Sequence, residues 1–288
     1  MFGFLNVDKP AGITSRDLVN RVQRLVKPHK VGHAGTLDPL ATGVLVVAVG
    51  PATRLVEYVQ RLPKTYRGTF LLGRTSDTED IEGNVVELLD ASIPTGTELR
   101  ALLPNFVGTI EQRPPAFSAL KVGGQRAYDL ARRGEAVELA PRSIEIQAIE
   151  LAAYAYPRLE LVIRCGSGTY IRSLGRDIAR ALGTDAVMSA LVRTAIGPFD
   201  IEHALNGDDL SPERIQKQIL PPAVGLGDMP RVVVTAEEQK RLLNGQPVLN
   251  RWDVTADEAA AVGSAGGLVA IIRLDDGQLR PDKCFPAG

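Results

Sequence analysis

Residues 32–45 read Gly-His-Ala-Gly-Thr-Leu-Asp-Pro-Leu-Ala-Thr-Gly-Val-Leu and place one acidic residue, Asp38, in a turn built from glycine, threonine and proline. Pro39 fixes its own φ and disfavours helix at Asp38, and the three glycines permit angles and close approaches that a side chain would block. The apolar residues 44–49 predict a buried strand that anchors the turn to a core. An Asp-Pro pair alone commonly starts an ordinary turn, but the full string is more specific and indicates a presented carboxylate.

The composition is that of an enzyme-sized globular protein. The chain has 288 residues, of which 44% are hydrophobic, enough for one large domain and a small one. No apolar run reaches the ~18 residues of a membrane span, and the N-terminus lacks a signal-peptide pattern, so we expect a cytoplasmic protein without a membrane segment. Cys165 and Cys284 are expected to be reduced, and the three histidines give no zinc-ligand spacing, so we expect no metal site.

The net charge of −1 hides a segregation of charge along the chain. Residues 1–74 carry eleven Lys and Arg against four Asp and Glu, whereas residues 75–112 carry eight acids and one base. Residues 113–134 are basic again, and residues 164–193 hold five arginines against two acids. Solvated faces would explain any one of these clusters, but three of them on one chain favour a cleft that binds phosphates in a salt-dependent manner.

Hydrophobic periodicity predicts strands separated by helices in both halves of the chain. The expected strands are residues 4–7, 44–49, 64–72, 143–151, 159–164, 186–196 and 268–274. The expected helices are residues 15–26 with Ser15 as N-cap, a helix from Pro51 through Val59, residues 170–182 ended by Gly183, and residues 237–243. This order predicts an α+β fold with a large, mostly antiparallel sheet flanked by helices.

Two segments are predicted to be additions to this core. Residues 112–135 are rich in Pro, Gly and Arg and form an insertion in a catalytic domain of residues 1–227. Residues 228–288, after the Pro221-Pro222 connection, form a small C-terminal domain. Residues 200–288 carry nine bases against fourteen acids, a balance that fits a purely structural cap.

Four segments together resemble the bacterial TruB family of tRNA pseudouridine synthases. The opening string is similar to the family's catalytic motif, residues 6–15 (NVDKPAGITS) to its Lys-Pro segment, residues 64–66 to its tyrosine motif and residues 165–174 (CGSGTYIRSL) to its arginine motif. Order and spacing agree from residue 4 to about 200. The resemblance implies the pseudouridine synthase fold, and it implies a PUA-like RNA-binding domain for residues 228–288 as the alternative to a structural cap. It also implies a thumb-like role for residues 112–135, which we expect to be mobile without RNA.

The family's activity is the isomerisation of a uridine in the TΨC loop of tRNA, by a stand-alone, monomeric enzyme without cofactor or obligatory protein partner. The reaction breaks the bond from ribose C1′ to N1, turns the base over and joins C1′ to C5. An aspartate can serve as nucleophile at the sugar carbon or as a base that removes a ribose proton to give a glycal, and the sequence leaves both open. Asp38 must be ionised although buried, which requires a cationic partner.

The resemblance also implies a role for each matching residue. Arg172 is expected to pair with Asp38, and Tyr66 to stack on the extruded uracil and act in proton removal at C5. Substrate binding is expected of His33, which occupies or supports the space left by flipped nucleotides, and of Lys9, Pro10, Leu191, Gly35, Thr36 and Leu37. The expected RNA-binding residues are Arg113, Lys121, Arg126, Arg132 and Arg133. Taken singly, each could be an ordinary core, turn or surface residue.

Two other functions compete with this interpretation. A guide-RNA-dependent pseudouridine synthase shares the aspartate motif, but the thumb-like insertion and the lack of a lysine-rich tail favour the stand-alone form. A non-catalytic tRNA-binding or tRNA-folding protein would need the basic segments but not the complete Asp, Tyr and Arg set. A metal- or nucleotide-dependent enzyme has neither a ligand cluster nor a phosphate loop to support it.

Overall fold

The turn that carries Asp38 lies where the chain passes from one compact unit to another. The computed structural model describes residues 1–285 except 119, 123, 127, 129, 131, 132 and 134–138. Unit 1 consists of Met1–Asp38, Val44–Leu62 and Gly197–Gly288, and unit 2 of Pro39–Gly43 and Pro63–Ile196. The first boundary between the units therefore falls directly after Asp38.

Unit 1 contains the predicted N-terminal strands and helix. Strand β1 (Gly3–Lys9) lies between β14 (Leu205–Asn206), which is parallel to it, and β3 (Thr42–Val49), and β2 (Val31–His33) pairs antiparallel with β3. Helix α1 (Ser15–Leu25) buries Leu18 and Val22 in one cluster with side chains of β1 and β3. Seven consecutive residues of β3 are buried, which confirms the strand predicted from the apolar run.

The start of α1 differs in detail from the prediction. The N-cap is Thr14, whose hydroxyl accepts from the Asp17 N–H at 3.1 Å, while the Asp17 carboxylate accepts from the Thr14 N–H at 3.0 Å. Ser15, predicted as the cap, is instead the first helical residue, because Thr14 is the residue with extended backbone and an acidic partner three positions on. The helix predicted from Pro51 is a 3₁₀ turn, η1 (Gly50–Leu55), followed by α2 (Val56–Arg61).

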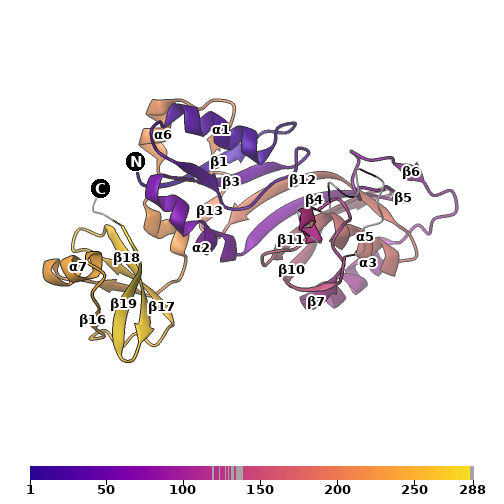
Figure 1. Cartoon of the computed structure of the whole chain (residues 1–288). Helices are drawn as coiled ribbons and strands as arrows, with labels where there is room; N and C mark the ends of the chain where they lie inside the picture. Colours follow the sequence, from indigo (N-terminus) through magenta and orange to yellow (C-terminus); the bar gives the residue numbers. More distant parts are fainter. Residues whose placement is uncertain are drawn as a thin grey trace. The chain divides into compact units, whose positions relative to one another are not determined.

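The rest of unit 1 includes the C-terminal residues. Its further elements are β13 (Phe199–Asp200), α6 (Pro212–Gln218), η3 (Pro222–Leu226), β15 (Arg231–Val233), α7 (Ala236–Leu243), β16 (Val248–Leu249), β17 (Glu258–Val262), β18 (Leu268–Asp275) and β19 (Gln278–Cys284). Five strands form a separate sheet in the order β15-β17-β18-β19-β16, against which α7 packs (Figure 1). This sheet has its own apolar core, as expected of a small domain; the boundary at residue 228 stays a prediction.

Unit 2 is built on an antiparallel sheet in the order β12-β4-β11-β10-β7. The bounds are β4 (Lys64–Leu72), β7 (Gly108–Gln112), β10 (Arg142–Ala155), β11 (Arg158–Cys165), β12 (Ala186–Ile196), α3 (Gly96–Leu102), η2 (Leu103–Phe106) and α5 (Ile171–Ala181). Helix α5 packs against β12 and β4, and α3 against β10 (Figure 1). Strands β4 and β12 have the predicted bounds, and the predicted α+β fold with a mostly antiparallel sheet is confirmed.

Two short hairpins complete unit 2. Strands β5 (Arg74–Thr75) and β6 (Val86–Glu87) pair with each other, as do β8 (Lys121–Val122) and β9 (Gln125–Arg126). The second hairpin belongs to the predicted thumb-like insertion, part of which lies outside the described residues. Within the described part of the chain, no helix is both long and apolar enough to cross a membrane.

Candidate active site

The Asp38 turn is the loop of the β2–β3 hairpin. The Ala34 N–H donates to the Val46 carbonyl at 2.9 Å, which closes the hairpin on the side of His33. On the other side of the loop, the Ser15 hydroxyl accepts from the Leu37 N–H at 2.8 Å and donates to the Leu37 carbonyl at 3.0 Å. The backbone directly before Asp38 is therefore held to the first turn of α1, and Asp38 itself is half-buried.

The segment after Asp38 is fixed within unit 2. Thr42 and Gly43, the first residues of β3, pair in parallel with Val192 and Arg193 of β12. A Cβ built on Gly43 would lie 2.3 Å from the Arg193 carbonyl oxygen, and Gly43 has a φ of +98°. Both the close approach and the left-handed backbone require glycine at this end of the motif.

The strand register of unit 2 places Tyr66 among buried cations. Arg193 of β12, which is 2% exposed, is directly opposite Tyr66 of β4. Lys64 precedes Tyr66 by two residues in β4, so the side chains of all three residues are on one face of the sheet. Lys64 donates from Nζ to the Ser167 hydroxyl at 2.7 Å. Burial, together with the nearby Arg193 charge, lowers the pKa of Lys64 to about 8.

The same face carries the start of α5 and the predicted apolar residue Leu191. Leu191 is opposite Gly68 in β4 and is 8% exposed. A Cβ on Gly68 would lie 3.5 Å from the Ile171 side chain, and one on Gly175 would lie 2.1 Å from the ring of Phe70, so α5 sits directly on β4. The structure thus brings the tyrosine and arginine motifs to one face of the sheet.

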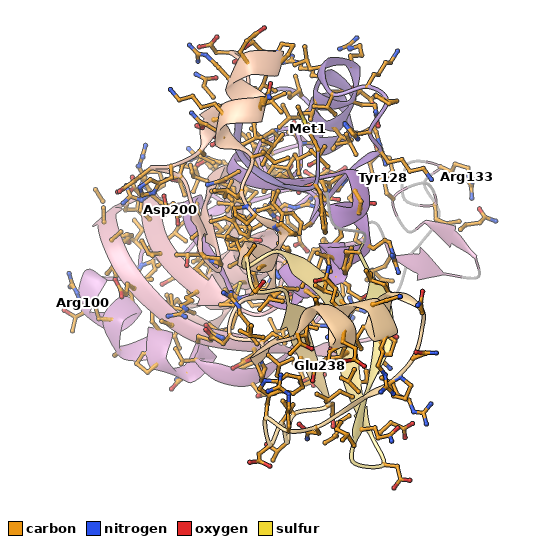
Figure 2. All side chains as sticks on the ribbon, turned by 90° about the vertical axis from the view of Figure 1, so that its left-hand side faces the viewer. Met1, Arg100, Tyr128, Arg133, Asp200 and Glu238 are labelled. Carbon is orange, nitrogen blue, oxygen red and sulfur yellow. The ribbon has the colours of Figure 1, made fainter. Side chains whose placement is uncertain are left out.

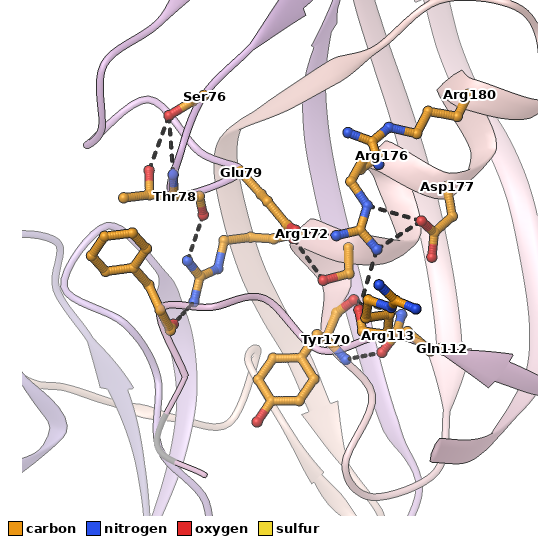
Figure 3. A network of polar contacts seen from close by, with 12 residues as sticks. Ser76, Thr78, Glu79, Gln112, Arg113, Tyr170, Arg172, Arg176, Asp177 and Arg180 are labelled. Carbon is orange, nitrogen blue, oxygen red and sulfur yellow. Dashed lines mark hydrogen bonds and ion pairs between the residues drawn. The ribbon is translucent and has the colours of Figure 1, made fainter. Parts of the chain in front are cut away.

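Arg172 occupies a buried polar network at the start of α5 (Figure 3). Its guanidinium donates to the Thr78 carbonyl at 2.8 Å, the Asp80 carboxylate at 3.1 Å and the Phe117 carbonyl at 3.2 Å. The side chains of Arg172 and Asp80 are only 10% and 4% exposed. Asp80 also accepts from the Thr78 hydroxyl at 2.5 Å and the Glu82 N–H at 3.0 Å. The carboxylate partner that the structure gives to Arg172 was missed by the sequence analysis, and the pairing with Asp38 stays a prediction.

A second ion pair extends this network along α5. Arg176 contacts Glu79, which also accepts from the Ser173 hydroxyl at 2.6 Å, and Arg176 donates to the Arg113 carbonyl at 3.2 Å (Figure 3). Burial raises the pKa of Glu79 against the opposing effects of Ser173 and Arg176. Glu79 has a φ of +62° and its carbonyl accepts from the Met188 N–H at 3.0 Å, so its loop is tied to β12.

These contacts correct the interpretation of residues 164–193 as a phosphate-binding surface. Arg176 and Arg193 are buried, the Arg172 side chain is only 10% exposed, and Arg180 pairs with Asp185 at 2.9 Å. The acidic segment around Asp80 therefore supplies internal partners to arginines distant in sequence. The four-residue spacing of Arg172 and Arg176 places both on one face of α5, but only the tertiary contacts identify their carboxylates.

Lys9 stabilises the segment that leads into α1. It is fully buried in β1, and its Nζ donates to the carbonyls of Pro10 and Ile13 at 2.8 Å each. The turn of residues 10–13 is thereby closed before Thr14 begins the helix. Lys9 and Pro10 thus hold the turn that precedes α1, the helix whose first residue, Ser15, binds the loop of Asp38. Their contact with substrate stays a prediction.

The predicted RNA-binding residues all belong to the insertion, residues 112–135. Arg113 is exposed, and Lys121 and Arg126 are paired residues of β8 and β9. Arg133, exposed and labelled in Figure 2 near Tyr128, donates to the Gln125 side chain at 2.6 Å. Arg132 lies outside the described residues. Among the residues that the structure describes, no group of three or more His, Cys, Asp or Glu side chains is arranged to hold a metal ion.

Comparisons with known proteins agree with the motifs. Residues 23–171 match the family described as TruB family pseudouridylate synthase (N terminal domain). The chain is 42% identical to a tRNA pseudouridine synthase B of Gluconacetobacter diazotrophicus over 98% of this chain and 96% of that protein. It is also 42% identical to the protein of that name from Dehalococcoides mccartyi, over 99% of this chain and 97% of that one. Among solved structures, it resembles a chain of a Cbf5-Nop10-Gar1 complex, with a TM-score of 0.76, 25% identity, and coverage of 98% of this chain and 84% of that chain.

Proposed function

The chain belongs to the TruB family of pseudouridylate synthases, and from this we propose that it isomerises uridine to pseudouridine in the TΨC loop of tRNA. The observation that carries the proposal is the similarity, at 42% identity over 98% of this chain, to a protein named tRNA pseudouridine synthase B. The enzyme acts as a cytoplasmic monomer, without a cofactor or an obligatory protein partner, on the T-arm of tRNA.

Asp38 supplies the carboxylate in this proposal. It either attacks C1′ as the C1′–N1 bond breaks, or removes a ribose proton to give a glycal. After the uracil has turned, C1′ bonds to C5 as the Asp38–C1′ bond breaks or, in the glycal route, as Asp38 returns the ribose proton. The proton on C5 then leaves and N1 gains a proton, so the product is an isomer of the substrate and the Asp38 carboxylate is regenerated. Two features support the role of Asp38: the Ser15 clamp on Leu37 before it and the fixed Thr42–Gly43 segment after it.

Tyr66 and Arg172 have complementary roles. Tyr66 stacks on the extruded uracil and its phenol takes part in removal of the C5 proton. Lys64 and Arg193 place two cationic side chains on the same face of the sheet as the Tyr66 ring. Arg172 orients the carboxylate of Asp38, and its three described contacts, which fix the guanidinium plane, support that role.

The remaining predicted residues shape and bind the substrate. His33, at the end of β2, occupies or supports the space left by the flipped nucleotides. Gly35, Thr36 and Leu37, in the same loop as Asp38, also bind the substrate. Arg113 and Arg133, with Lys121, Arg126 and Arg132, bind phosphates of the T-arm.

The experiment is conversion of a synthetic T-arm hairpin by the purified full-length protein alone, with pseudouridine mapped by carbodiimide modification and primer extension. We expect a single pseudouridine in the loop with wild type, and none with Asp38→Asn, which should fold and bind the hairpin as wild type does. Turnover by Asp38→Asn above background would refute the role of Asp38.

A guide-dependent synthase is the second candidate, because the fold also matches a chain of a Cbf5-Nop10-Gar1 complex. The identity is 25% to that chain, against 42% to the proteins named tRNA pseudouridine synthase B, which favours the stand-alone enzyme. An inactive protein that becomes active only with guide RNA and partner proteins would support the second candidate.

A further inference from the structure

We propose that Ser15 is a positioning residue for the isomerisation, acting through the backbone of Leu37 to set the direction in which Asp38 points. This inference rests on the proposed function. It gives a role in the reaction to Ser15, which the sequence analysis predicted only as the N-cap of a helix. Ser15 does not reach the substrate in this proposal; its hydroxyl acts through the loop alone.

The two hydrogen bonds of Ser15 hold two successive peptide groups. The Leu37 N–H, which donates to Ser15 Oγ at 2.8 Å, belongs to the peptide group before Leu37. The Leu37 carbonyl, which accepts from the same hydroxyl at 3.0 Å, belongs to the peptide group that includes the nitrogen of Asp38. Because peptide groups are planar, fixing both of them fixes φ and ψ of Leu37 and the position of the Asp38 Cα.

Burial makes this clamp specific to a hydroxyl. Ser15 is 2% exposed and Leu37 is 4% exposed, so water does not readily replace a lost bond. A hydroxyl donates one hydrogen bond and accepts others, which lets one side chain satisfy both backbone groups of Leu37. An alanine would leave a buried N–H and a buried carbonyl without these bonds, and the loop would relax to recover partners.

The hydroxyl is not needed by its own helix. Thr14 and Asp17 form the capping box of α1, and the described bonds of the Ser15 hydroxyl both go to Leu37. The helix is anchored by Leu18 and Val22 in the core and by the Lys9 bonds that close the preceding turn. Ser15 is thus a rigid reference point to which the hairpin loop is attached.

The expected effect is on the chemical step. A displacement of a reacting group by about 1 Å can cost on the order of 100-fold in rate, whereas contacts that bind the tRNA arm are unaffected. Ser15→Ala should therefore lower kcat between about 10-fold and 100-fold, with KM and the Kd for the T-arm hairpin within about twofold of wild type.

Thr14→Ala is the matched control, because it removes the cap of the same helix one residue earlier and leaves Leu37 untouched. It should lower the midpoint of urea unfolding and keep kcat within about twofold of wild type. Ser15→Cys provides a second variant of similar volume, whose thiol is a weak donor and acceptor. It should fold, and should lose kcat in the same direction as Ser15→Ala.

Steady-state kcat and KM, hairpin affinity and the midpoint of urea unfolding are to be measured on wild type and the three variants. A Ser15→Ala or Ser15→Cys enzyme with wild-type kcat would overturn the proposal, as would loss of kcat in proportion to loss of stability in both Ser15→Ala and Thr14→Ala. If Ser15→Ala does not fold, the kcat of Ser15→Cys relative to wild type is the deciding measurement. An inactive wild-type protein would instead count against the proposed function, so the two failures are distinguishable.

Discussion

Replacement of Gly43 by alanine tests whether the end of the Asp38 loop is fixed as the structure indicates. The substitution places an L-residue at a φ of +98°, which costs about 1–3 kcal/mol. It also places a Cβ 2.3 Å from the carbonyl oxygen and 2.9 Å from the nitrogen of Arg193. These are backbone atoms of β12, the strand that pairs with β3 at Gly43 and with β4 at Tyr66. They cannot move aside without disturbing the sheet.

The free-energy cost of the close contact between a Cβ at position 43 and Arg193 can be separated from the cost of the backbone conformation by comparison with Gly108. This glycine has nearly the same φ, +102°, but no atom lies within 4 Å of a Cβ built on it. The loss of stability in Gly108→Ala should therefore reflect the backbone conformation alone. Overpacking in a well-packed region costs about 1–3 kcal/mol more, so Gly43→Ala should lose about 2–6 kcal/mol in total.

Equilibrium urea unfolding of the two variants and wild type gives the comparison. We expect Gly43→Ala to be less stable than Gly108→Ala by about 1–3 kcal/mol, and to form pseudouridine more slowly, because its segment begins directly after Asp38. Equal stability of the two variants, within about 0.5 kcal/mol, would refute the reasoning from the Gly43–Arg193 contact.

The remaining predictions concern the buried charges and the tyrosine. Burial lowers the pKa of Lys64 from 10.5 to about 8, so between these values the folded protein binds fewer protons than the unfolded chain and Lys64 makes stability rise with pH. Burial raises the pKa of the Cys165 thiol from 9.0 to about 11, so above about pH 9 this group makes stability fall with pH and opposes the effect of Lys64. Between about pH 8 and 9, the stability of Lys64→Met should therefore rise less with pH than that of wild type. Equal slopes of stability against pH, measured by urea unfolding, would contradict this. Asp80→Asn leaves Arg172 buried without its described carboxylate and should cost about 3 kcal/mol in the same assay; a loss below about 1 kcal/mol would show that the pair is dispensable. Tyr66→Phe retains the stacking ring and should bind the T-arm hairpin normally while losing turnover; full turnover would exclude proton transfer by the phenol.

Elements with a strong local pattern were predicted well from the sequence. The bounds of β4 and β12 agree with the prediction because Gly and Pro mark their ends: β4 lies between Pro63 and Gly73, and β12 ends directly before Gly197 and Pro198. Elements of two or three residues, such as β2 and β14, were not predicted, since strands this short exist only through pairing with β3 and β1.

Errors arose where a local pattern allowed two neighbouring residues the same role. Thr14 and Ser15 are equally suitable caps by residue type, and the structure assigns the cap to Thr14 and the Leu37 clamp to Ser15. Charge counting failed for residues 164–193 for a related reason. Linear density of arginine does not say which side chains are exposed, and here three of them are inside, two with acids from distant segments.

The family, the type of reaction and the residues that match its motifs could be read from the order of the amino acids, because four segments keep the residue types and spacing of the family's motifs. The sequence also determined the main strands and helices through their hydrophobic periodicity. The tertiary contacts were needed to show that Ser15 holds Leu37, that Arg172 pairs with Asp80, and that Lys64 and Arg193 lie on the same face as Tyr66. Most of these contacts join residues far apart in the chain, and their geometry follows from strand register and helix packing, which no local pattern encodes.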